Sequence, residues 1–363
     1  MEKEQALPMN NQLLHTEAIS LLKQLIATPS FSREEDRTVS IIENFLKDHG
    51  VETNRHLNNI WAVNKFYDEA KPSILLNSHH DTVKPNKGYT LDPFTPVEKD
   101  GKLFGLGSND AGGSLVSIIS VFLYFHDQKD LKYNLILGIS AEEEISGKNG
   151  VEALLSVLPK IDCGIVGEPT LLEMAIAERG LMVLDCVAKG KAGHAARNEG
   201  DNAIYKAVKD IEWLQTYQFE KVSEFIGPVK MTVTSIETEN KAHNVVPSEC
   251  KFIVDVRINE QYTHEEVLQV IEKNLQSSVT MRSDRLRSSM IALDHPLVKA
   301  GLKLQRPYYG SPTSSDKALM PFPALKIGPG DSARSHTADE FIFVDEIKQG
   351  IELYIQLLNQ VLQ

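Results

Sequence analysis

A histidine and an aspartate two residues apart follow a short apolar run near residue 80. The segment reads Leu76-Asn-Ser-His79-His80-Asp81-Thr-Val83, and the run 74–76 is typical of a buried parallel strand. Side chains two apart on an extended chain face the same side, so His79 and Asp81 can act together. His79 can bind a metal, and Asp81 can hold that imidazole or a neighbouring group in place. Taken alone, a histidine beside a strand is more often a structural residue than a metal ligand.

Four further acidic or histidine side chains lie in loops later in the chain. Three of them follow apolar strands, whereas Asp110 stands just before a helix. Singly they have ordinary explanations, Asp110 as a helix cap and the acidic run 142–144 as a solvated turn. Parallel strands, however, deliver their carboxyl ends to one edge of a sheet, where open α/β sheets place ligands. The joint set therefore predicts a two-metal site made of His79, Asp110, Glu144, Glu168 and His336.

The ligand types indicate which metal and which reaction to expect. Imidazole and carboxylate ligands suit Zn²⁺, with Co²⁺ or Mn²⁺ as substitutes. Two metals with five protein ligands must share one, and Asp110, with two oxygens, is the candidate bridge. Two such metals lower the pKa of a water between them, which makes it a nucleophile near neutral pH. A base must still move its proton to the leaving amine, and Glu143 beside Glu144 fits that role.

The elements that position these residues alternate between strands and helices. Before residue 180, helices are expected at 15–27, 34–48 and 114–125, and strands at 60–66, 74–76, 135–139 and 161–166. Near the C-terminus, a helix at 296–304, a strand at 324–327 and a helix at 344–362 are expected. This alternation predicts an α/β fold with a mostly parallel sheet and helices on both faces.

The pattern changes near residue 180. Strands are expected at 181–189, 229–236, 251–258 and 279–283, with helices at 201–215 and 264–275. The resulting order, β-α-β-β-α-β, is the ferredoxin-like pattern. We therefore predict a catalytic domain of residues 1–179 and 288–363, interrupted by an inserted α+β domain of residues 180–287.

Length, charge and cysteine content restrict the class of protein. The 363 residues, 42% hydrophobic and 24% charged, are ordinary for a globular enzyme of two domains. The net charge of -12 argues against a nucleic-acid partner, which needs a basic face. Three widely spaced cysteines, no signal-peptide pattern and no apolar run of membrane-spanning length predict a cytoplasmic protein without a membrane partner.

Seven short motifs, in order along essentially the whole chain, carry a resemblance to a known family. They are Ser78-His-His-Asp-Thr-Val83, Gly105-Leu-Gly-Ser-Asn-Asp110, Ala141-Glu-Glu-Glu144, Gly167-Glu-Pro-Thr170, Gly193-His-Ala195, Asn244-Val-Val-Pro247 and His336. The chain resembles the dinuclear-zinc amidohydrolases and exopeptidases that include acetylornithine deacetylase, succinyl-diaminopimelate desuccinylase, carboxypeptidase G and the aminoacylases. The resemblance implies a zinc-exopeptidase-like catalytic domain that holds two Zn²⁺ ions per subunit.

The resemblance also implies a role for each matching residue of the catalytic domain. The implied zinc ligands are His79, Asp110 as the bridge, Glu144, Glu168 and His336. Glu143 corresponds to the general base, and Asp81 to the aspartate of the family's His-x-Asp motif. The register within the three consecutive glutamates is open, because base and ligand could also lie one residue earlier. Leu106 departs from many relatives, which have arginine there.

For the inserted domain, the resemblance implies a lid that also forms a homodimer. His194 would stabilise the oxyanion of the tetrahedral intermediate, often from the other subunit. Asn244, Arg257, Ser314 and Ser315 are the predicted substrate-binding residues. An ion pair with Asp255, two residues away on the same strand face, is the alternative role for Arg257.

The implied function is zinc-dependent hydrolysis of the amide bond of a small N-acyl amino acid. The segment from Gly328 to Glu340 looks most like the deacetylases, so the predicted substrate is N-acetylornithine, N-succinylornithine or N-acetylcitrulline, in arginine biosynthesis. Succinyl-diaminopimelate desuccinylase and a small dipeptidase are the alternatives. A hypothesis of another class is a metal-free binding homologue. Such a protein should lack a ligand or the base, whereas here every position is filled.

Overall fold

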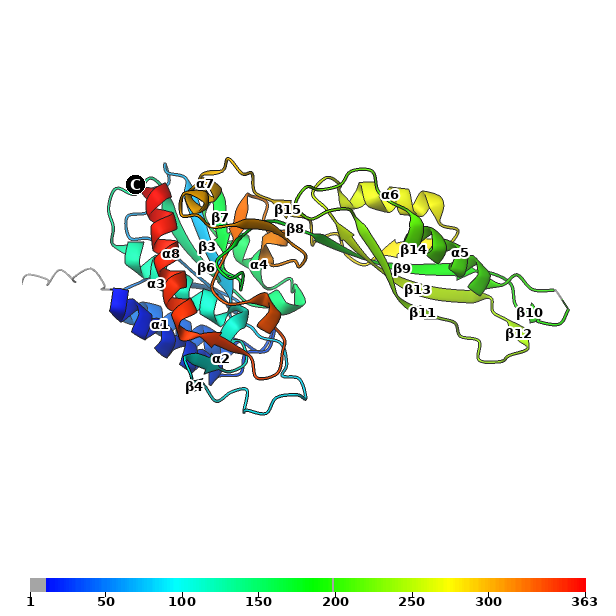
Figure 1. Ribbon diagram of the computed structural model, residues 1–363, viewed down its shortest axis with the longest axis horizontal. Helices are drawn as coiled ribbons and strands as arrows, with labels where there is room; N and C mark the ends of the chain where they lie inside the picture. The colour runs from blue at the N-terminus through cyan, green and yellow to red at the C-terminus, as the bar shows by residue number, and fades with distance from the viewer. Residues whose placement is uncertain (1–10, 198) are drawn as a thin grey trace, which may run out of the picture. The chain divides into compact units, whose positions relative to one another are not determined.

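The computed structural model describes residues 11–197 and 199–363, and its contacts divide the chain into two compact units (Figure 1). The first unit runs to Ile176 and adds Ile291–Tyr309 and Ser315–Gln363. The second unit consists of Ala177–Met290 and Gly310–Ser314. The predicted borders, at 179/180 and 287/288, lie a few residues from the observed ones, but the prediction omits Gly310–Ser314.

The main sheet has the strand order β1-β2-β6-β3-β7-β17-β8-β15, and β16 (Tyr308–Ser311) pairs with β8. Its central strands are parallel: β6 (Asn134–Ser140), β3 (Ser73–His79), β7 (Cys163–Val166) and β17 (Ala324–Lys326). The flanking strands pair antiparallel: β1 (Asn54–His56), β2 (Asn59–Val63), β8 (Met174–Glu178) and β15 (Ser289–Met290). The predicted α/β fold with a mostly parallel sheet is confirmed, and the four parallel strands end at the same edge.

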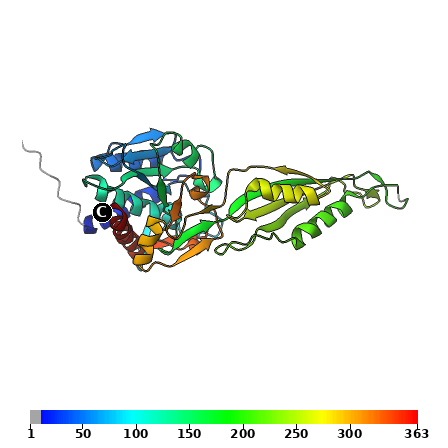
Figure 2. The ribbon, with the colours of Figure 1, turned by 90° about the horizontal axis from the view of Figure 1, so that it is seen from above.

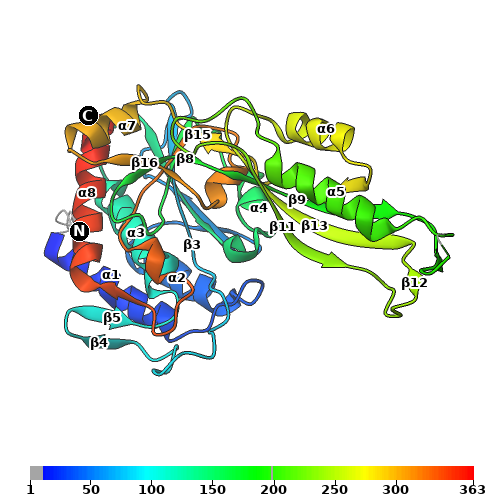
Figure 3. The ribbon, with the colours of Figure 1, turned by 45° about the vertical axis from the view of Figure 1, so that its right-hand side comes forward.

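Helices cover both faces of this sheet, which explains why every residue of β3 and β6 is buried. On one face, α3 (Gly113–His126) packs on β3 and β6 and is itself covered by α1 (Asn11–Ile26) and α8 (Val344–Leu362) (Figures 1 and 3). On the other face, Val151 of α4 (Val151–Leu155) joins a cluster with Leu75 and Ile136. Within the described residues, this unit also contains the α-helices α2 (Asp36–Asp48) and α7 (Pro296–Lys303). No helix in the described part of the chain has both the length and the apolar character that crossing a membrane requires.

A separate three-stranded sheet joins two loops that are far apart in the sequence. It has the order β18 (Phe341–Phe343), β5 (Lys102–Phe104) and β4 (Val97–Lys99), all antiparallel. Because Phe341 pairs opposite Phe104, the chain before β18 lies beside the chain after β5. The backbone N–H of Gly105 also donates to the carbonyl oxygen of Glu340 at 3.0 Å. This sheet therefore positions the loops that carry His336 and Asp110 next to each other.

The second unit contains a four-stranded antiparallel sheet with the order β11-β13-β9-β14. Its elements follow in the predicted order: β9 (Gly180–Lys189), α5 (Ala203–Thr216), β11 (Lys230–Glu237), β13 (Glu249–Ile258), α6 (His264–Asn274) and β14 (Ser278–Met281). The residues of β9 alternate between buried and half-buried, because both helices pack on one face of the sheet (Figure 2). A two-stranded ribbon, β10 (Gly193–His194) with β12 (Val245–Val246), completes the unit.

Candidate metal centre

His79, the last residue of β3, presents an unpaired nitrogen to three carboxylates. Its Nδ1 donates to the backbone carbonyl oxygen of Asp81 at 3.0 Å, so Nε2 carries the free lone pair. Nε2 is buried and has no hydrogen-bond partner. Around it lie Asp110 Oδ1 at 3.4 Å, Glu143 Oε2 at 3.8 Å and Glu168 Oε1 at 3.8 Å. A buried nitrogen that faces several carboxylates without a hydrogen bond fits the role of a metal ligand.

A second group forms around His336, on the loop before β18. His336 Nε2 donates to Glu144 Oε2 at 2.9 Å and lies 3.7 Å from Asp110 Oδ2. The potential ligand atoms of Asp110, Glu144 and His336 all lie within 4.8 Å of one another, and so do those of His79, Asp110 and Glu168. The structure thus brings all five predicted ligands together. Asp110 is the residue that the two groups share.

The distances within both groups fit divalent metal ions. Two ligands bound at about 2.0–2.1 Å to a tetrahedral ion lie about 3.3–3.4 Å apart. The His79–Asp110 distance of 3.4 Å already matches, and the 3.7 Å between His336 and Asp110 is close. His336 Nε2 and Glu144 Oε2 form a hydrogen bond at 2.9 Å, and the two atoms would move slightly apart to bind an ion between them. Glu143 belongs to neither group, which suits a base better than a ligand.

Burial of these carboxylates makes their negative charge costly. Burial raises the pKa of Glu143 well above its usual value and raises that of Glu168 to about 8. For His79, burial opposes protonation, but the nearby carboxylates of Glu143, Asp110 and Asp81 outweigh it and raise the pKa. The hydrogen bond with Glu144 raises the pKa of His336 to about 9. A pair of divalent cations would neutralise this crowded charge directly.

Asp81 holds the loop that carries the predicted base. Its Oδ1 accepts the backbone N–H of Glu143 at 3.0 Å, and its Oδ2 accepts that of Glu144 at 3.2 Å. Ser32 Oγ donates to Oδ2 at 2.7 Å, and Oδ1 lies 3.3 Å from His79 Nδ1. One carboxylate therefore fixes both the imidazole and the two glutamates, which is the positioning role predicted for Asp81.

The orientation of the three consecutive glutamates bears on the register that the sequence leaves open. Glu143 and Glu144 face the two ligand groups, as the distances above show. Glu142 Oε1 instead accepts a hydrogen bond from Asn149 Nδ2 at 3.0 Å. A Cβ on Gly147 would lie 1.9 Å from Glu142 Oε2, so this carboxylate packs against that glycine. The geometry supports Glu143 as base and Glu144 as ligand over the register one residue earlier.

Glu340 is a site residue that sequence reasoning did not single out. Its Oε1 accepts the backbone N–H groups of Asn109 at 2.8 Å and Asp110 at 2.9 Å, and its Oε2 accepts that of Gly107 at 3.1 Å. Burial raises the pKa of Glu340 to about 7. The loop that presents Asp110 is therefore held by a buried carboxylate four residues after His336. In the sequence, only the short spacing from the predicted ligand His336 could have pointed to Glu340 as a site residue.

We expect Glu340→Gln to weaken metal binding about 10–100-fold, the usual effect of losing a group that orients a ligand. The glutamine keeps one accepting oxygen but turns an NH₂ donor toward a backbone N–H. Competition with a chromogenic chelator measures the affinity, and Glu352→Gln, exposed on α8, is the matched control. Unchanged metal affinity in Glu340→Gln would show that the loop holds Asp110 without this carboxylate.

The two predicted substrate-binding serines each form a hydrogen bond with another residue of the chain. Ser314 Oγ donates to the carbonyl oxygen of Arg179 at 2.8 Å. Ser315 is buried and caps the short turn Asp316–Leu319 by accepting the N–H of Lys317. Asp316 accepts a hydrogen bond from Ser140 Oγ, and burial raises its pKa to about 7. Substrate contact by either serine stays a prediction.

Within the second unit, the structure brings His194 and Asn244 together. His194 pairs with Val245 across β10 and β12, and the N–H of Ala195 donates to the carbonyl oxygen of Asn244 at 3.0 Å. Both side chains are exposed. Arg257 instead forms a bidentate ion pair with Asp255, at 2.8 and 3.0 Å. The structure therefore favours the alternative role for Arg257, whereas the roles of His194 and Asn244 stay predictions.

Comparison with known proteins supports the family resemblance that the sequence motifs indicate. Residues 75–360 match the model of peptidase family M20/M25/M40. Succinyl-diaminopimelate desuccinylase of Rickettsia bellii (strain OSU 85-389) is 27% identical over 281 residues, which is 72% of this chain and 70% of the relative. In structure, the chain is similar to aminopeptidase PepT from Bacillus cereus (TM-score 0.76, 18% identity, 96% of this chain and 98% of that chain). It is also similar to YXEP of Bacillus subtilis, a dinuclear metal binding peptidase (TM-score 0.72, 17% identity, 97% and 99%).

Proposed function

The chain belongs to peptidase family M20/M25/M40, and from that premise we propose that it hydrolyses the amide bond of a small N-acyl amino acid. The observation that carries the proposal is Asp110, shared by two groups of metal-ligating side chains beside a carboxylate that belongs to neither. We propose Zn²⁺ as the metal, because two histidines and three carboxylates suit it, with Co²⁺ or Mn²⁺ as substitutes.

In this proposal the chain's own residues position the reaction and move the proton. When bound, the two metals would supply Lewis-acid activation of a water and of the scissile carbonyl. Glu143 would accept a proton from the attacking water and deliver it to the departing amine nitrogen. Asp81 would keep Glu143 in place through the backbone hydrogen bond described above. The imidazole of His194 would donate to the developing oxyanion.

The relatives favour a different substrate from the one that the sequence motif predicts. Relatives of the chain at 22–28% identity include several succinyl-diaminopimelate desuccinylases. We therefore propose succinyl-diaminopimelate as the leading substrate, ahead of N-acetylornithine, which lacks support among these relatives. The proposed role moves accordingly from arginine to lysine biosynthesis. Both substrates are N-acyl amino acids, so the chemistry assigned to Glu143 is the same for either.

Amine release from a panel of substrates tests this ranking. The panel contains succinyl-diaminopimelate, N-acetylornithine, N-succinylornithine, N-acetylcitrulline and an unmodified dipeptide, each with zinc-loaded and with chelated enzyme. We expect kcat/KM for succinyl-diaminopimelate to exceed the others at least about tenfold, and no turnover after chelation. A lead for N-acetylornithine would restore the ranking of the sequence motif. If zinc-loaded enzyme hydrolyses none of them, the proposed substrate class is wrong.

The proposed homodimer has its own test, because the histidine that corresponds to His194 often comes from the other subunit in the family that the chain resembles. His194→Ala and Glu143→Gln should each be nearly inactive alone. If one subunit supplies Glu143 and its partner supplies the imidazole, mixed dimers regain an intact site. Mixing the two variants under conditions that exchange subunits should then restore about a quarter of the wild-type rate, as expected for random pairing with one intact site per mixed dimer. No recovery despite demonstrated subunit exchange would place both residues in one subunit's site.

A further inference from the structure

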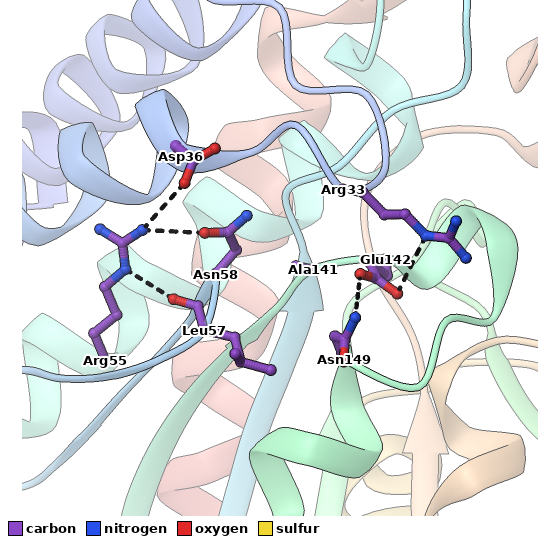
Figure 4. Close-up of a pocket in the computed structure, with 8 residues that line it drawn as sticks. All are labelled: Arg33, Asp36, Arg55, Leu57, Asn58, Ala141, Glu142 and Asn149. Carbon is purple, nitrogen blue, oxygen red and sulfur yellow. Dashed lines mark hydrogen bonds and ion pairs between the residues drawn. The ribbon is translucent and has the colours of Figure 1, made fainter.

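A hollow of about 470 Å³ opens beside the loop after β6 in the first unit (Figure 4). It lies between the turn joining β1 to β2, the start of α2 and the residues that lead into the predicted base. Its walls are formed by Arg33, Asp36, Arg55, Leu57, Asn58, Ala141, Glu142 and Asn149. None of the five predicted metal ligands lines it, so it is a separate site. Its volume lies in the range typical of small-molecule pockets.

Glu142 gives this hollow a buried acceptor that lacks a donor. Its side chain is only 6% exposed, and its Oε1 is satisfied by Asn149 Nδ2. Its Oε2 has no hydrogen-bond partner. The nearest cation, Arg33 Nε, is 4.0 Å away, which is too far for a hydrogen bond. Because an unpaired buried carboxylate oxygen is costly, a ligand that brings an N–H donor to this point is favoured.

Arg33 gives the hollow a cation whose donors are available. Its side chain is 71% exposed, and the distant pair with Glu142 is its one polar side-chain contact recorded within the described residues. Its backbone is fixed nevertheless, since its N–H donates to Glu35 Oε1 at 2.7 Å. The guanidinium can therefore turn toward a ligand while the backbone of Arg33 stays in place. A planar fork of this kind binds a carboxylate through two parallel hydrogen bonds.

Arg55 and Asp36 make the opposite wall, and they are paired with neighbours. Arg55 Nε donates to the carbonyl oxygen of Leu57 at 2.8 Å, and Nη2 donates to Asn58 Oδ1 at 3.0 Å. Its guanidinium also lies 3.8 Å from Asp36 Oδ1 and 3.7 Å from Glu43 Oε2, which is outside the lining. The charged residues that line the hollow thus balance, two positive and two negative. A ligand that carries only one sign would meet repulsion from one half of the lining.

We propose that this hollow binds a free α-amino acid as its zwitterion. A small movement of the wall exposes the buried Glu142 Oε2 to the hollow, so that the ammonium group donates to it while the carboxylate accepts from the guanidinium of Arg33. The ammonium group then supplies the hydrogen-bond donor that Glu142 lacks, and the carboxylate supplies an acceptor for Arg33. The side chain of the amino acid occupies the remaining volume. The ligand would sit against the residue directly before Glu143, whose own amide is held by Asp81. If the proposed amide hydrolysis is right, the site binds the same class of molecule that the reaction releases.

Calorimetric titration of the metal-loaded protein with three matched compounds tests the zwitterion requirement. The probes are L-alanine, propionate, which lacks its amino group, and ethylamine, which lacks its carboxylate. We expect one L-alanine per chain beyond any bound at the metal centre, and binding at least about tenfold weaker for either half-molecule. Propionate binding as tightly as L-alanine would make this a simple anion site and overturn the proposal. No binding of L-alanine at millimolar concentration would overturn it as well.

Substitutions locate the binding. Arg33→Met removes the charge from an exposed side chain and should weaken L-alanine binding at least about tenfold. Arg37→Met, exposed on α2 outside the hollow, is the matched control and should bind like wild type. Glu142→Gln should weaken binding by losing the ammonium partner while keeping the shape. L-alanine binding that Arg33→Met and Glu142→Gln leave unchanged would place the ligand elsewhere and contradict the proposal. Because binding is read without turnover, this result is independent of whether the proposed reaction is right.

Discussion

Glu143→Gln is expected to lower kcat about 10²–10⁴-fold while the protein keeps its full complement of metal. The carboxylate lies 3.8 Å from His79 Nε2 but belongs to neither ligand group, so its loss should remove proton transfer and leave ligation intact. Glutamine has the same shape and still occupies the space, but it cannot accept the proton. Steady-state kinetics together with the metal content of the same preparation would check both halves of the expectation.

Two other glutamates serve as comparisons for this variant. Glu52→Gln changes an exposed residue outside the site and should match wild type. Glu142→Gln should cost far less than Glu143→Gln, because its carboxylate faces Asn149 and Gly147. The opposite result would be a large loss of turnover in Glu142→Gln and nearly wild-type activity in Glu143→Gln. That result would identify Glu142, one residue earlier, as the general base.

Asp110→Ala is expected to abolish binding of both metals and to lower kcat/KM at least about a thousandfold. Asp110 Oδ1 lies 3.4 Å from His79 Nε2, and Oδ2 lies 3.7 Å from His336 Nε2, so its loss opens both groups. The metals supply several kcal/mol of transition-state stabilisation, and each 1.36 kcal/mol is a factor of ten in rate. Metal stoichiometry after dialysis, beside kcat/KM for the preferred substrate, measures both effects.

His336→Ala is the informative comparison, because His336 belongs to one group only. It should retain the metal held by His79 and Asp110 with Glu168, and lose the other. A graded series of two, one and no metals for wild type, His336→Ala and Asp110→Ala would demonstrate the sharing. If Asp110→Ala still binds one metal as tightly as wild type, Asp110 serves a single site and the assignment of the bridge is wrong.

Much of this arrangement follows from patterns that the sequence displays openly. Apolar runs predict the central strands, and a residue within a few positions after each run, such as Glu144 or Glu168, then falls at the sheet edge. The β-α-β-β-α-β order likewise predicts the antiparallel sheet of the second unit. These predictions succeed because buried strands and amphipathic helices are encoded by local hydrophobic periodicity.

Other features depend on contacts between distant segments that no local pattern encodes. The strands β5 and β18 have three residues each, too few for a periodic signal, yet their pairing places His336 beside Asp110. Glu340 acts through backbone N–H groups of a loop some 230 residues earlier, and any residue type except proline can supply such donors. Arg257 on its strand fits either a substrate or Asp255 equally well by sequence, and only the geometry shows the bidentate pair.

The most direct test of the central claim is anomalous diffraction at the zinc edge from crystals of the zinc-loaded protein. Two zinc ions per chain are predicted. One should lie within bonding distance of His79, Asp110 and Glu168, and the other within bonding distance of Asp110, Glu144 and His336. A single ion, or two ions that do not share Asp110, would contradict the two-metal account of this site.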